Sequence, residues 1–150
     1  MSTPFLRTTI QSSLLRRNNI FRTSPSLQQT IRKFHYTSPK MTVHNISTTE
    51  EWKAALANNK IVMLDCFATW CGPCKAIAPM LVNHSNDEQF KDIFFAKIDV
   101  DELPEVSQEL GIRAMPTFML FKDGEKAEEL VGANPAALVN LLKKGAGVEA

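Results

Sequence analysis

The first 49 residues of this 150-residue chain contain no aspartate or glutamate, and the acidic residues begin at Glu50. Seven basic residues lie in the same stretch: Arg7, Arg16, Arg17, Arg22, Arg32, Lys33 and Lys40. From residue 42 onward, 10 Lys or Arg stand against 16 Asp or Glu, a net charge of −6. The net charge of +1 for the whole chain therefore averages a cationic leader and an acidic domain.

Long apolar runs are also missing from the leader, where the longest are pairs such as Phe5-Leu6 and Leu14-Leu15. A secretory signal needs an apolar run of about 7 to 15 residues, and a transmembrane helix needs about 20. We therefore expect neither a secretory signal nor a membrane-spanning helix, and no membrane partner.

What the leader does have is twelve Ser or Thr among its first 41 residues, together with its arginines. An Arg-rich, Ser-rich and acid-free start is typical of a mitochondrial presequence. The run Arg32-Lys33-Phe34-His35-Tyr36 resembles a processing site, with the eight residues 34–41 removed after a first cut. We predict a presequence over 1–41, disordered and cleaved, a domain over 42–150, and residence in the mitochondrial matrix.

Two other interpretations of the leader remain open at this stage. It could be an unspecific basic arm, and initiation at Met41 could yield a cytosolic form. Contact with nucleic acid is not expected, because the arm lacks interleaved aromatic residues and a fold behind it.

Cysteine is scarce: the chain holds Cys66, Cys71 and Cys74. Three thiols without a secretory signal do not form a disulfide scaffold, but they suit a reducing compartment where a disulfide is transient and catalytic. A structural zinc site needs four ligands, usually two C-x-x-C pairs, so we expect no metal. The histidines fall in the leader (His35), the first expected strand (His44) and a helix end (His84). We expect none of them beside Cys71, so a Cys–His protease is not indicated.

The hydrophobic pattern predicts an α/β domain with the order β-α-β-α-β-α-β-β-α. Strands are expected at 43–46, 61–67, 93–98, 117–121 and 126–131. One helix is expected at 48–58, and a second is expected after Cys71, with a kink at Pro79. A third, short helix should follow Asp101, which would cap it, and a fourth should start at Asn134-Pro135 and stop at Gly145. Lys122-Asp123-Gly124-Glu125 predicts a hairpin turn. This alternation indicates a mixed sheet with helices on both faces.

The sequence Trp70-Cys71-Gly72-Pro73-Cys74-Lys75 follows the strand expected at 61–67. One helical turn can bring two sulfurs spaced C-x-x-C within bonding distance. Free N–H groups in the first turn of a helix stabilise a thiolate. We therefore expect Cys71 to be the nucleophile and Cys74, one turn further in, to resolve the mixed disulfide. Such a pair passes two electrons without a bound cofactor.

With these residues the chain resembles the thioredoxin family from Val43 to about Gly145. The resemblance is carried by 65–75, Lys97, Asp99, Met115-Pro116-Thr117, the run 121–124 and Gly132. It implies the thioredoxin fold, a central mixed five-stranded sheet flanked by four helices. It also implies reduction of protein disulfides, recycling by an NADPH-dependent flavoenzyme (thioredoxin reductase), no cofactor on the chain itself, and a monomer. Peroxiredoxins and methionine sulfoxide reductases are the targets that it suggests.

The resemblance also implies roles for single residues. Asp65 would take the proton of Cys74, with Lys97 as its charge partner, and a merely structural ion pair is the alternative. Gly72 and Pro73 would tune the disulfide, and the bond before Pro116 would be cis. The surface that meets targets would surround the Cys71 sulfur: Trp70, Gly72, Pro73, Met115, Pro116, Gly132 and Ala133.

Two alternative functions concern the cysteine pair, and a separate expectation concerns its neighbour Cys66. An oxidising isomerase is disfavoured because Gly-Pro stands between the cysteines. A binding module with incidental electron transfer would keep its function without both thiols. Strand alternation places Cys66 on the face opposite Asp65, where we expect an inert buried thiol.

Overall fold

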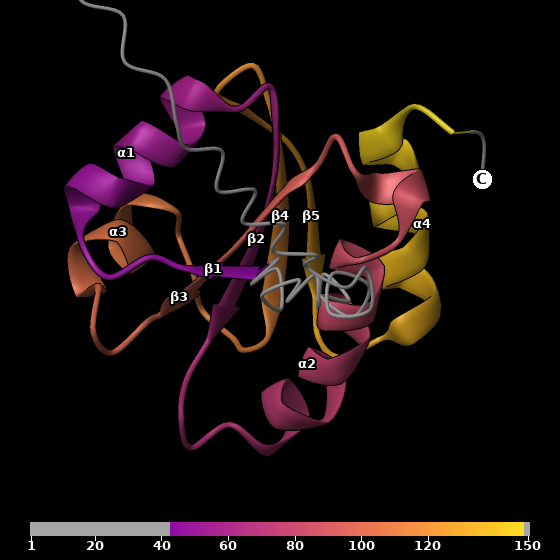
Figure 1. Ribbon diagram of the computed structural model, residues 1–150. Helices are drawn as coiled ribbons and strands as arrows, with labels where there is room; N and C mark the ends of the chain where they lie inside the picture. The colour runs from indigo at the N-terminus through magenta and orange to yellow at the C-terminus, as the bar shows by residue number, and fades with distance from the viewer. Residues whose placement is uncertain (1–42, 149–150) are drawn as a thin grey trace, which may run out of the picture. The chain divides into compact units, whose positions relative to one another are not determined.

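A computed structural model describes residues 43–148, which form a five-stranded sheet with helices on both faces (Figure 1). The elements follow in the order β1 (Val43–Asn45), α1 (Thr49–Asn58), β2 (Ile61–Phe67), α2 (Gly72–Ser85), the 3₁₀ helix η1 (Glu88–Phe90), β3 (Phe94–Asp99), α3 (Pro104–Glu109), β4 (Thr117–Lys122), β5 (Glu125–Val131) and α4 (Pro135–Ala146). The predicted fold class and element order are confirmed. The presequence predicted over 1–41 lies outside the described residues.

The sheet has the strand order β1-β3-β2-β4-β5, so β2 lies at its centre. β3 runs parallel to both β1 and β2, whereas β4 is antiparallel to β2 and to β5. Figure 1 shows α1 and α3 on one face of the sheet and α2 and α4 on the other. The central strand therefore ends between two layers of helices, directly before the cysteine pair.

Two apolar cores fill the space between the sheet and its helices. On the α1 and α3 side, Trp52 and Val106 pack with alternate strand residues such as Leu64 and Cys66. On the α2 and α4 side, Ile77 and Leu138 pack with residues of the other alternation. Because successive strand residues point to opposite faces, neighbours such as Asp65 and Cys66 lie on different sides of the sheet.

The helix starts follow the capping residues that the sequence offered. The Thr48 hydroxyl accepts a hydrogen bond from the Glu51 N–H at 3.1 Å, and the Glu51 carboxylate accepts one from the Ser47 N–H. Asn134 caps α4 in the same way, followed by Pro135. At the hairpin, Asp123 and Gly124 both have positive φ, the pattern of a two-residue turn between antiparallel strands.

Three details of the helices differ from the predictions. α4 passes through Gly145 and ends at Ala146 with Gly147 as its C-cap, because Gly147 adopts the left-handed conformation while Gly145 packs in the helix against Leu120 and Ile93. α3 begins after Leu103, with no side-chain cap, so the prediction that Asp101 caps it is wrong. The 3₁₀ helix η1 was not predicted.

No helix within residues 43–148 is long and apolar enough to cross a bilayer.

Candidate active site

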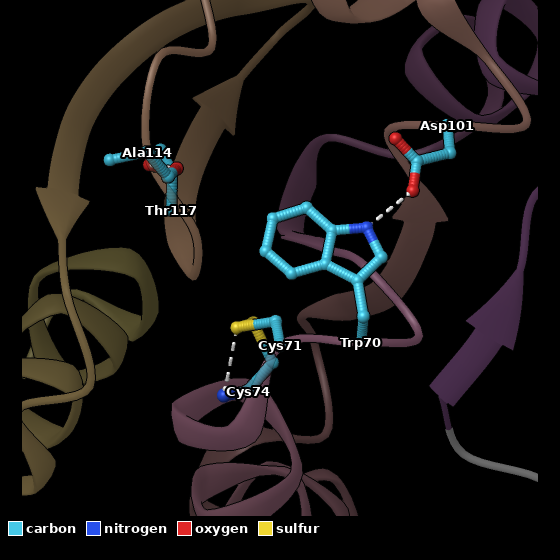
Figure 2. The surroundings of a disulfide bond; sticks show 6 residues. All are labelled: Trp70, Cys71, Cys74, Asp101, Ala114 and Thr117. Carbon is cyan, nitrogen blue, oxygen red and sulfur yellow. Dashed lines mark hydrogen bonds between the residues drawn. A yellow bond between two sulfur atoms is a disulfide. The ribbon is translucent and has the colours of Figure 1, made fainter.

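The cysteine pair lies where β2 leads into α2. Cys71 is the N-cap of α2, and its side chain is joined to that of Cys74 by a disulfide bond, with 5.4 Å between the two Cα atoms. The Cys74 N–H donates a hydrogen bond to the Cys71 sulfur at 3.2 Å (Figure 2). An N–H of the first helical turn therefore points at the sulfur that we expect to carry negative charge.

Around the disulfide, the chain changes from exposed to buried within a few residues. Gly72 and Pro73 are exposed, whereas Cys71 and Cys74 are 5% and 3% exposed in this oxidised form. The two cysteines pack with Ala68, and Phe67, Val100 and Met115 close this small cluster. Cys74 is more buried than Cys71, as we expected, but the difference between their exposed fractions is small.

Asp65 lies in the middle of β2 and is almost fully buried, with 4% of its surface exposed. It lines a cavity of about 370 Å³ together with Cys74, Lys75 and Lys97. Its Oδ1 atom has no hydrogen-bond partner among the described residues. Burial raises the pKa of Asp65 from 3.8 to about 7, against an opposing attraction from Lys97. A carboxyl group that exchanges its proton near neutral pH thus shares a cavity with Cys74.

Lys97 is the direct neighbour of Asp65 in the register of β2 and β3. Both residues are described by the structure, and their charged groups do not form an ion pair within 4.0 Å. The Lys97 ammonium lies instead 5.3 Å from the ring centroid of Phe67, in a cation–π arrangement. Lys97 therefore acts on Asp65 through its field rather than through a direct bond.

Two distant segments are tied together next to the disulfide. The peptide bond between Met115 and Pro116 is cis, as the resemblance implied. The Gly132 N–H donates to the Pro116 carbonyl oxygen at 2.8 Å, and Thr117 pairs with Val131 across β4 and β5. Gly132 has φ +97°, a conformation that favours glycine. The pairing brings Met115, Pro116, Gly132 and the exposed Ala133 together.

Sequence reasoning missed two residues at this site. Val131 precedes Gly132, and 56% of its surface is exposed. Asp101 accepts a hydrogen bond from the Trp70 indole N–H at 2.8 Å (Figure 2). No local pattern signals this contact, because 31 residues separate the two partners.

The remaining thiol and the histidines stay away from the pair. Cys66 belongs to the core on the α1 and α3 side, as alternation predicted, and burial raises its pKa. The described histidines contact phenylalanine rings: His44 stacks on Phe94 and His84 meets Phe90 edge-on. No cluster of three or more His, Cys, Asp or Glu side chains suited to a metal occurs in residues 43–148.

Comparisons with known proteins agree on one family. The thioredoxin family model matches residues 43–144. Thioredoxin-2 of Pyricularia oryzae is 53% identical over 125 residues, which cover 81% of this chain and 72% of that protein. Oxidised mitochondrial thioredoxin 3 of Saccharomyces cerevisiae is 36% identical with a TM-score of 0.65, over 71% of this chain and 99% of that one. A chain from a study of thiol resolution in yeast mitochondrial 1-Cys peroxiredoxin by the glutathione and thioredoxin systems is also similar. It is 36% identical, with a TM-score of 0.64, over 68% of this chain and 94% of that one.

Proposed function

The chain belongs to the thioredoxin family and is a thiol-disulfide oxidoreductase that acts through Cys71 and Cys74. From this we propose the role of each residue in the site, the enzyme that supplies the electrons and the compartment in which the protein works. The observation that carries the proposal is a cysteine pair at the start of α2 whose second member, Cys74, shares a cavity with the buried carboxyl group of Asp65.

In the first step, the Cys71 thiolate attacks one sulfur of a target disulfide. A Cys71–target disulfide forms, the target disulfide breaks, and its other sulfur leaves as a thiolate that takes up a proton. The position of Cys71 as N-cap supports this role, since the Cys74 N–H already points at its sulfur. Gly72 and Pro73 shape the short loop between the sulfurs and so tune how readily the pair is reoxidised.

In the second step, Cys74 loses its proton and attacks the Cys71 sulfur. The mixed disulfide breaks, the second target sulfur leaves as a thiolate, and the Cys71–Cys74 disulfide remains. Asp65 takes the Cys74 proton. The cavity that they share is also lined by Lys75 and Lys97 and has room for water, so a water molecule can carry the proton between them. Lys97 limits the cost of the negative charge that Asp65 carries before it takes this proton.

Targets dock on the exposed surface around Cys71. Trp70 and Ala133 supply exposed apolar area, and the bend at Met115 and Pro116 offers backbone groups to an extended target segment. Contacts made mainly through backbone place few demands on target side chains, which suits a reductant of many proteins. Peroxiredoxins and methionine sulfoxide reductases are the targets that we propose, and the similarity to the chain from the peroxiredoxin study supports the first.

The oxidised pair is recharged by an NADPH-dependent flavoenzyme of the thioredoxin reductase type. In a coupled assay with such a reductase and insulin as the target, we expect NADPH oxidation that depends on this chain. A Cys66→Ala variant should keep the activity, because Cys66 lies on the other face of the sheet. If the chain cleaves no insulin disulfide even when dithiothreitol keeps it reduced, the proposed reaction is wrong.

We further propose that residues 1–41 direct the protein to the mitochondrial matrix. The acid-free, Arg-rich composition supports this proposal, as does the similarity to mitochondrial thioredoxin 3.

We expect a fusion of the whole chain to a fluorescent protein to enter mitochondria, and a form that begins at Met41 to remain in the cytosol. Replacing Arg7, Arg16 and Arg17 with glutamine should reduce import several-fold. Amino-terminal sequencing of the protein from purified mitochondria should give a start near Thr42. An intact Met1 end on that protein would contradict the cleavage.

A further inference from the structure

Trp70 is the most exposed large apolar side chain of the described residues, with 67% of its surface accessible. Burial of so little of the ring cannot by itself hold one rotamer, since little apolar area is removed from water. The side chain has one directional contact instead, the hydrogen bond from its indole N–H to the Asp101 carboxylate at 2.8 Å. A bond to a charged acceptor is stronger than one between neutral groups.

Asp101 is itself held in place. Its backbone N–H donates to the buried Asp99 carboxylate at 2.9 Å, and the Leu103 N–H donates to the Asp99 carbonyl oxygen at 3.0 Å. The Val100 N–H donates to the Phe67 carbonyl oxygen at 2.9 Å, which ties this turn to the end of β2. Backbone hydrogen bonds therefore link the turn that carries Asp101 to the end of β2, which leads directly to Trp70.

Because Trp70 directly precedes Cys71 in the chain, this hydrogen bond decides how the ring is oriented relative to the disulfide. In the view of Figure 2, the nitrogen edge of the indole is turned towards Asp101, and its six-membered ring is directed to the side of Ala114 and Thr117. In the same view, the Cys71–Cys74 disulfide is drawn below the six-membered ring. Met115 lies in the chain between Ala114 and Thr117, so the six-membered ring is directed to the segment along which we propose that an extended target docks.

We propose that Asp101 is a positioning residue that fixes the Trp70 indole as one wall of the docking groove for protein targets. This inference rests on the proposed docking of protein disulfides around Cys71. Asp101 does not touch the sulfurs. It removes the rotational freedom of the indole before a target arrives, so a protein target meets a wall that is already in place. A small disulfide can reach Cys71 without contacting the Trp70 indole, so the fixed orientation of the indole does not strengthen its binding.

The test compares Asp101→Ala, Asp101→Asn and Glu102→Ala. Asparagine keeps an oxygen that can accept the indole bond, and Glu102 is a neighbouring exposed carboxylate, so its removal changes the charge but not the bond. We expect Asp101→Ala to raise KM for insulin about threefold to tenfold with kcat little changed, the range of one lost hydrogen bond. Asp101→Asn should restore most of the affinity, and Glu102→Ala should have the wild-type KM. Reduction of a small aromatic disulfide should be the same in all four proteins.

A second readout does not depend on activity. The chain has two tryptophans, Trp52 and Trp70, and therefore two indole N–H signals in a ¹H–¹⁵N spectrum. In Asp101→Ala the Trp70 signal should move upfield, as expected for a lost hydrogen bond, while that of buried Trp52 stays in place. An unmoved Trp70 signal, an unchanged KM, an equal effect of Glu102→Ala or an equal loss with the small disulfide would each overturn the inference. Failure of the wild-type chain to reduce insulin would instead count against the proposed function, and the spectra would still report on the Asp101–Trp70 bond.

Discussion

Replacing Cys71 with serine is expected to abolish the reduction of protein disulfides, whereas replacing Cys74 with serine should stop the reaction halfway. At Cys71 we expect a loss of at least about a thousandfold, because a hydroxyl is ionised far less than a thiol near neutral pH and is a poor nucleophile towards sulfur. In Cys74→Ser, the Cys71 thiolate still attacks, but no second thiol is left to release the target. The product should be a covalent complex of one chain and one target.

The complex can be measured directly. Incubation of reduced Cys74→Ser with an oxidised target should give a species with the summed mass of the two proteins. Dithiothreitol should separate this complex by reducing the disulfide that joins them. Cys66→Ala serves as the control, since it removes a thiol outside the site. If Cys71→Ser forms the complex and Cys74→Ser does not, the roles of the two cysteines are reversed.

The same variants separate an electron carrier from a binding module. A cell that lacks this protein should not be rescued by the double variant Cys71→Ser/Cys74→Ser, because no electrons can pass without the thiols. Rescue by the double variant would favour a function in binding.

Replacing Asp65 with asparagine should stabilise the protein at alkaline pH while slowing the release of targets. The folded protein keeps the Asp65 proton up to pH about 7, whereas the unfolded chain loses it near 3.8. Between these values the folded state binds more protons, so the free energy of unfolding falls as the pH rises through this window. Above pH 7 the buried charge costs up to about 4 kcal/mol, because each tenfold change in proton affinity corresponds to about 1.4 kcal/mol. Asparagine does not titrate and avoids this cost.

Urea unfolding between pH 4 and pH 9 checks the expectation. The stability gained by Asp65→Asn should be small at pH 4, grow up to about pH 8 and then level off. Asp123→Asn makes the same chemical change at an exposed position of the hairpin turn, so it should leave the pH dependence unaltered. A gain that is constant from pH 4 to pH 9 would contradict the raised pKa of Asp65.

The kinetic half of this prediction concerns the second step. Without a carboxylate to take the Cys74 proton, single-turnover reduction at neutral pH should slow several-fold, with target binding little altered. The deficit should shrink at high pH, where hydroxide can remove the proton. Single-turnover rates equal to the wild type across this range would leave Asp65 with a structural role only.

Local chemistry explains what the sequence determined. The C-x-x-C pair follows an apolar run, so the sequence predicted that the pair lies where a strand leads into a helix, and it does. Thr48 and Asn134 predicted helix starts because their side-chain oxygens accept a hydrogen bond from a backbone N–H only a few residues further along the chain. Alternation along β2 separated Asp65 from Cys66. The order of elements and the fold class follow from such short-range patterns.

Only the tertiary structure decided which distant segments meet. Composition could not show whether Lys97 pairs with Asp65 directly, and the cation–π contact with Phe67 depends on the register of two strands. Gly145 and Gly147 are both reasonable helix ends by sequence, and close packing against Leu120 selected the second. Asp101 looked like a cap for α3, yet the fold turned it towards an indole 31 residues away. Contacts of this kind depend on where the sheet places the ends of its strands, and no neighbour in the chain encodes them.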